Sequence, residues 1–420
     1  MSRLILKPQI FAWLLVASAG LVACGSGAGG GSDDSQTTWS NNPAGATTFS
    51  GTSAAYQGSI SGLGSIVVNG VRFETTDSVV YDSDDFSTSY DSNTSTFSSP
   101  LALGMTVALF GDVDDAQSLG RAARIRVVGG VRGTMSAIDT TALTLSLPTQ
   151  IVQLSSATTY GGTSDGTPTG TAITSLTQLA ALTTNPLLTV YGLPQADGSF
   201  LASRVVVTNA QTHAMDVAVR GTITAIAGNN YSVKTDATQT VTVVCNSCAI
   251  QPAGNAPMVG DAVRVLATDI SQWNSPTLNA ARLQLVNASY LTTFSGAPNS
   301  ATYAKIKGVA VWDGSRWLVD GVEVTGATLT AGTLYEIKGT WSGSALAASR
   351  VEVEGQRSFT DNSGSNRTYS NEFYGAVSQL NGSRFTVQGI NVNAASAYFP
   401  YGSAASLSNG SFVEVKGSYV

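Results

Sequence analysis

The sequence is poor in the residues from which most catalytic and metal sites are built. It contains one histidine and three cysteines, and only 11% of its 420 residues are charged. A lone histidine supplies no pairing of base and nucleophile, and the chain has no serine-hydrolase, phosphate-binding or zinc-protease motif. We therefore expect a protein that is not an enzyme and that uses neither a cofactor nor a metal ion.

The charge that is present is mostly negative, with a formal net charge of −6. An acidic chain repels phosphates, so nucleic acid is not an expected partner. The hydrophobic fraction of 43% is high enough for folded domains. The chain is too long for one small core, and its length suits several domains.

A targeting signal opens the chain. Arg3 and Lys7 precede an apolar run at residues 10–22, and the run ends in Leu-Val-Ala-Cys at Cys24. This order resembles a bacterial lipobox, which implies cleavage of residues 1–23 and acylation of Cys24. We expect the acyl chains to anchor the protein, because no later segment has about 20 consecutive apolar residues. Gly25 favours the outer membrane of the cell envelope, and an ordinary signal peptide that happens to contain cysteine is the alternative.

A low-complexity segment rich in Gly, Ser and Asn follows at residues 24–55. It has no apolar period, so we expect a flexible, disordered tether and a first packed strand near Tyr56.

The rest of the chain repeats itself five times. Each unit begins with a strand that contains a glycine, and these are Gly58, Gly133, Gly221, Gly308 and Gly375. Two hairpins follow, several with Asn-Gly or Asp-Gly turns, and then a fourth strand that ends in glycine except at Ala267. We expect the units to span 56–128, 129–210, 217–287, 303–356 and 371–420. A glycine inside a strand indicates a bulge, a bend or a close backbone approach.

The pattern of each unit therefore predicts five short antiparallel strands. The only helix signal lies between the third and fourth strands and is clearest at residues 175–184 of the second unit. We predict an all-β protein of tandem five-stranded barrels that are OB-like, with an SH3-like barrel as the alternative.

Together, the lipobox, the tether, the first-unit GSISGLGSIVVNGVRF and the later valine-rich strands resemble the bacterial lipoproteins of domain-of-unknown-function family 5666. The resemblance implies repeated small β-domains on an exported protein and supplies no activity. Ala267 departs from the pattern.

The fifth unit reaches Val420 without a fifth strand. Two interpretations stay open: a truncated or loosely packed unit, or a strand donated by a partner or a neighbouring copy.

Cys245 and Cys248 form a close pair at the end of a predicted strand. In an exported protein such a pair is expected to be oxidised. A structural disulfide is the favoured interpretation, because thioredoxin-type chemistry needs the pair at a helix start and zinc needs further ligands.

The fourth unit is rich in aromatic residues at two loops. Trp312 and Trp317 flank its first hairpin turn with Asp313 and Arg316, and Trp341 lies at the hairpin between its last two strands. These loops line the ligand face of OB folds, so the residues are candidates for stacking on sugar rings. The alternative is a cross-strand aromatic pair that only stabilises the hairpin.

An arginine also recurs at one position of the fifth strand, as Arg124, Arg204, Arg282 and Arg350. Its side chain either covers the barrel end or contributes to an anion-binding row. Overall, we expect a lipid-anchored envelope protein that binds or scaffolds through its barrels, with a glycan or an envelope protein as its partner.

Overall fold

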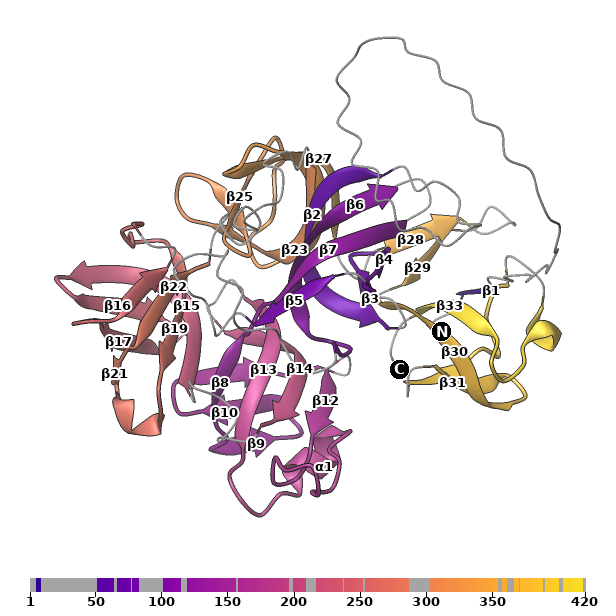
Figure 1. Cartoon of the computed structure of the whole chain (residues 1–420), viewed down its shortest axis with the longest axis horizontal. Coiled ribbons are helices and arrows are strands. Elements are labelled where there is room, and N and C mark those ends of the chain that lie inside the picture. Colours follow the sequence, from indigo (N-terminus) through magenta and orange to yellow (C-terminus); the bar gives the residue numbers. More distant parts are fainter. Residues whose placement is uncertain are drawn as a thin grey trace, which may run out of the picture.

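The computed structural model shows a nearly all-β chain of five units (Figure 1). It describes residues 5–8, 51–63, 66–76, 78–82, 101–114, 119–155, 158–195, 199–208, 217–236, 238–251, 254–286, 303–353, 357–360, 366–369, 371–387, 390–399 and 403–417. Cys24, Gly25 and His213 lie outside these ranges.

Unit 1 is a closed barrel. Its strands are β2 (Thr52–Gly62), β3 (Ile66–Val68), β4 (Val71–Glu74), β6 (Thr106–Asp114) and β7 (Leu119–Val127), with a short β5 (Val79–Asp82). β2 pairs with β3 and β6, β3 pairs with β4, and β6 pairs with β7, all antiparallel. β4 closes the barrel by pairing with β7 in parallel. This is the connectivity of an OB-type barrel.

Unit 2 repeats this plan. Its elements are β8 (Val131–Thr134), β9 (Ala137–Asp139), β10 (Thr144–Leu147), β11 (Gln150–Gln153), β12 (Thr159–Gly162), α1 (Leu176–Ala180), β13 (Leu187–Pro194) and β14 (Phe200–Val207). α1 occupies the place expected for the helix. Ser175 caps it by accepting a hydrogen bond from the Gln178 backbone, and Leu179 is buried.

Units 3 and 4 also close as barrels. Unit 3 contains β15 (Val217–Ala227), β16 (Asn230–Lys234), β17 (Thr240–Val244), β18 (Ala249–Gln251), β19 (Ala262–Ala267), η2 (Ile270–Gln272), β20 (Trp273–Asn274), β21 (Thr277–Asn279) and β22 (Arg282–Leu285). Unit 4 contains β23 (Tyr303–Trp312), β24 (Trp317–Val319), β25 (Val322–Thr325), β26 (Leu334–Trp341) and β27 (Ala345–Val353).

Unit 5 is the open member of the set. A small hairpin of β28 (Arg357–Thr360) and β29 (Asn366–Tyr369) precedes it. The unit contains β30 (Asn371–Asn381), β31 (Arg384–Val387), β32 (Ile390–Asn393), η3 (Ala404–Ser406) and β33 (Phe412–Gly417). Its sheet has the order β1-β33-β30-β31-β32, where β1 (Ile5–Pro8) comes from the start of the chain (Figure 1).

Buried apolar residues fill the interior of each unit. Tyr56, Phe73, Leu109 and Ile125 of unit 1 are completely buried. The rings of Tyr56 and Phe73 meet edge to face with centroids 5.0 Å apart. Each of the five units has its own apolar cluster of this kind. Because Ala54 is also completely buried, packing starts before the expected boundary near Tyr56.

The glycine that we expected at the end of the fourth strand lies inside that strand in units 1, 2 and 4, and it has a steric reason. At Gly111, Gly192 and Gly339 the ladder to the fifth strand slips by one residue, and a Cβ there would overlap a backbone oxygen of that strand. Unit 3 has Ala267 at this place. There the fifth strand is broken into β21 and β22.

Polar side chains dock units 1, 3 and 4 against one another. Asp320, at the β24–β25 turn of unit 4, accepts hydrogen bonds from Gln57 of unit 1 and Arg220 of unit 3. The Arg220 Nη2 to Asp320 Oδ1 distance is 3.1 Å, and each side chain is 3% exposed. β2 also pairs in parallel with β23, which joins the sheets of units 1 and 4. We call Gln57, Arg220 and Asp320 the junction triad.

Unit 2 is held by separate contacts. Gln150 bonds to both the backbone N–H and the backbone carbonyl of Arg220 in unit 3, at 3.1 and 2.9 Å. Ser203 and Arg204 donate hydrogen bonds to the backbone carbonyls of Gly104 and Leu103 in unit 1. Units 1–4 thus form one body, with unit 5 beside it (Figure 1).

Candidate functional site

The aromatic turn of unit 4 is exposed at the end of its barrel. β23 ends at Trp312 and β24 begins at Trp317, and these residues pair directly across the hairpin. Their ring centroids are 5.1 Å apart with a tilt of 58°. Trp312 is 47% exposed, whereas Trp317 is half-buried and packs against the unit 4 core. Trp312 therefore offers an exposed aromatic surface next to a second indole.

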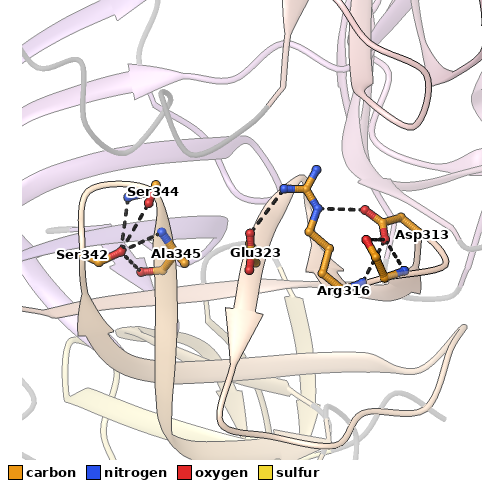
Figure 2. Close-up of polar contacts among 7 residues, drawn as sticks. Asp313, Arg316, Glu323, Ser342, Ser344 and Ala345 are labelled. Carbon is orange, nitrogen blue, oxygen red and sulfur yellow. Dashed lines mark hydrogen bonds and ion pairs between the residues drawn. The ribbon is translucent and has the colours of Figure 1, made fainter.

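A network of charges fixes the turn between the two tryptophans. The carboxylate of Asp313 accepts hydrogen bonds from Arg316 Nε at 2.8 Å and from the backbone N–H groups of Ser315 and Arg316 at 2.9 Å. Arg316 Nη1 also donates to Glu323 Oε2 of β25 at 3.3 Å, as Figure 2 shows. The turn is thus pre-organised by its own side chains.

These contacts determine the electrostatics of the turn. Partial burial opposes ionisation of Asp313, but the hydrogen bonds from Arg316 and Ser315 outweigh it and hold the pKa of the carboxyl well below its ordinary value. The bond to Asp313, together with that to Glu323, raises the pKa of Arg316. The rim beside Trp312 is therefore ionised over the whole physiological range, with its charges paired.

The hairpin loop between β26 and β27 lies next to the turn between β23 and β24. The two are adjacent because β25 pairs with β27 in parallel, with Glu323 opposite Ala345. Figure 2 shows Glu323 between this loop and the Asp313–Arg316 turn. Ser342 Oγ closes the loop by bonding to the backbone of Ala345. Trp341, which we expected on the ligand face, is only 9% exposed and belongs to the unit 4 core. Its ring supports the loop and is not available for stacking.

The cysteine pair lies in unit 3. Cys245 and Cys248 form a disulfide with a Cα–Cα distance of 4.9 Å, directly after β17. The strand context agrees with the structural interpretation. Among the described residues, no group of three or more His, Cys, Asp or Glu side chains is placed to hold a metal ion.

Two of the recurring arginines lie in different surroundings. Arg204 lies half-buried between units 1 and 2, and desolvation by burial lowers its pKa. Arg350 is exposed and pairs with Glu352 at 2.5 Å. The one shared sequence position thus serves docking in unit 2 and a surface ion pair in unit 4.

The sequence did not point to the junction triad. Asp320 had the appearance of an ordinary Asp-Gly turn residue, and it does adopt the positive φ of 45° that such turns need. The available signal was a polar residue before the strand glycine in units 1–4, as at Gln57 and Arg220.

Comparison with known protein families finds similarity in three regions of the chain. The model of the domain of unknown function DUF5666 matches residues 57–126, 132–206 and 374–420. The three matched regions fall in units 1, 2 and 5 and together cover less than half of the chain. Units 3 and 4 share the barrel plan of units 1 and 2, although they lie outside the matched regions.

Other comparisons add little. No curated protein matches the chain. A solved structure described as drosophila Unr CSD456 aligns with 55% of this chain and 97% of its own length, at 13% identity and a TM-score of 0.15. A likeness this low supports no inference about fold or function. No helix in the described ranges is long and apolar enough to cross a membrane.

Proposed function

We propose that this protein is a lipid-anchored, non-catalytic component of the cell envelope that binds or scaffolds through its docked barrels. The observation that carries the proposal is the docking of units 1–4 through buried side chains, with the junction triad at its centre. Such docking fixes the barrels relative to one another, so that their loops present one rigid surface. The lipobox at Cys24 supports attachment to the outer membrane, facing the periplasm or the exterior.

The anchor is tested with Cys24→Ser. We expect this variant to lose labelling by an alkyne fatty acid and to leave the membrane fraction, because the acyl chains are the proposed anchor. Wild-type protein and Ser26→Ala, a change two residues away, are the controls and should stay with the membrane. A Cys24→Ser variant that still sediments with membranes after a salt wash would show that another anchor exists.

A second function, glycan binding, is favoured by the exposed indole of Trp312 beside the fixed Asp313–Arg316 turn. An aromatic face suits the apolar side of a sugar ring, and paired charges at its rim suit hydroxyl groups. The polysaccharides of the cell envelope contain sugar rings of this kind and are the proposed ligands.

This function is tested on a glycan array. We expect Trp312→Ala to weaken binding at least about tenfold, which corresponds to 1.4 kcal/mol. Ile270→Ala is the matched control, because Ile270 is a similarly exposed apolar residue (42%) on unit 3. Equal binding by wild type and Trp312→Ala would remove unit 4 as the glycan site and leave the scaffold proposal standing.

A further inference from the structure

The outer edge of β33 in unit 5 accepts a strand from elsewhere in the chain. In units 1–4, the fourth strand lies between the first and the fifth. In unit 5, β33 pairs with β30 on one edge and with β1 on the other, both antiparallel. β1 therefore takes the place that β7 and β27 take in units 1 and 4.

The register of β1 is that of a fifth strand. Leu6 lies opposite Val415, just as Val351 lies opposite Ile337 in unit 4. Val415 and Ile337 occupy equivalent positions. Each pairs with the residue of its unit's first strand that stands two positions before that strand's glycine. The next residue of β1, Lys7, lies opposite Glu414. The edge thus accepts an antiparallel strand with an apolar residue opposite Val415 and a basic one opposite Glu414.

The lipoprotein cleavage proposed above removes β1, so the inference rests on that part of the proposed function. An uncovered β33 then presents a row of backbone donors and acceptors. β33 itself carries the pattern that its edge accepts. If two copies pair antiparallel about Val415, Val415 lies opposite its own counterpart, and Lys416 of each copy lies opposite Glu414 of the other.

We propose that the mature protein forms a two-fold symmetric dimer by antiparallel pairing of β33 from two copies. The interface is isologous, which means that the same surface of each copy contributes to it. The pairing of Glu414 with Lys416 therefore occurs twice, once on each side of the two-fold axis. The paired edge is short, so the free protein dimerises weakly. Anchoring of both copies in one membrane raises their effective concentration.

The test uses residues 24–420 with Cys24→Ser, so that the protein is not acylated. The dimer can then be measured even if the lipid-anchor proposal is wrong. Analytical ultracentrifugation from about 10 to about 300 μM should show a reversible dimer. Glu414→Lys and Lys416→Glu each place like charges opposite one another twice, so each should raise the dimer Kd at least about tenfold. Glu352→Lys on β27 is the matched control and should leave the Kd unchanged.

Charge exchange gives the decisive result. An equimolar mixture of the two single variants restores both opposite-charge pairs, and so does the double variant, so both samples should dimerise like the parent. A peptide of residues 3–9 should compete with the dimer, and the same peptide with Leu6→Lys should not. A monomer at every concentration, or a dimer indifferent to these charges and to the peptide, overturns the proposal.

Discussion

Replacement of Asp320 by alanine tests the junction triad most directly. The change leaves the guanidinium of Arg220, which is 3% exposed, without its carboxylate, and it removes the acceptor of Gln57. A buried ion pair broken on one side typically costs about 3–5 kcal/mol of folding free energy. Since whole domains are stable by about 5–15 kcal/mol, we expect a large loss that is still compatible with folding.

The assay should report on each unit separately. Hydrogen exchange followed by mass spectrometry gives an opening free energy for strands of every unit. Because Asp320 joins units 1, 3 and 4, protection should fall together in β2, β15 and β23. Asp139→Ala is the matched control, since Asp139 is an exposed residue at the end of β9 in unit 2 that accepts hydrogen bonds from the nearby backbone of Thr141 and Ala142.

A compensating variant separates charge from packing. If the loss comes from an uncompensated buried charge, Arg220→Met combined with Asp320→Asn should regain most of the stability, because both buried charges are then absent while Asn tolerates the positive φ of position 320 and keeps an acceptor for Gln57. A loss below about 1 kcal/mol for Asp320→Ala, the size of an exposed pair, would refute the reasoning. So would a loss confined to unit 4, because the units would then open independently.

Two further predictions concern single turns and strands. Gly339→Ala should destabilise unit 4 by about 1–3 kcal/mol, because the added Cβ would overlap the backbone oxygen of Ala347. Gly133→Ala is the control and should be tolerated, because a Cβ there has no neighbour nearer than 3.6 Å. Urea unfolding measures the stability of both variants. Asp313 has a lowered pKa when folded, so its contribution to stability is present above its unfolded pKa of about 3.9 and is lost only as the pH falls through the lower folded value. An NMR titration of the Asp313 carboxyl carbon with a midpoint at or above pH 4 would contradict this.

The barrel plan could be predicted from the sequence because its signals are local. Asn69-Gly70 and Asp320-Gly321 indicate turns that need positive φ at both residues, and the structure has 50° and 74° at the first pair and 45° and 78° at the second. Such turns fix the register of the adjoining strands. Repetition of these signals at similar spacing then indicates barrels of one kind.

The arrangement of the barrels could not be predicted in this way. Asp320 and Gln57 are 263 positions apart, and neither residue type reveals a partner at that separation. Trp341 illustrates the same difficulty within one unit, because a tryptophan at a strand end suits either a ligand face or a core. Its burial depends on packing with residues of other strands of unit 4, which is a tertiary property.

The barrel plan is kept in units 3 and 4, whereas their loops vary. These units keep the barrel closure of units 1 and 2, including the parallel pairing of the third and fifth strands. They differ at the barrel ends, where unit 3 has a disulfide turn and a broken fifth strand, and unit 4 has the turn of Trp312. Core positions tolerate few changes, whereas loops vary with function. Since units 3 and 4 also contribute Arg220 and Asp320 to the junction triad, their divergent loops are held rigidly on the body formed by units 1–4, and this is the arrangement that a binding surface needs.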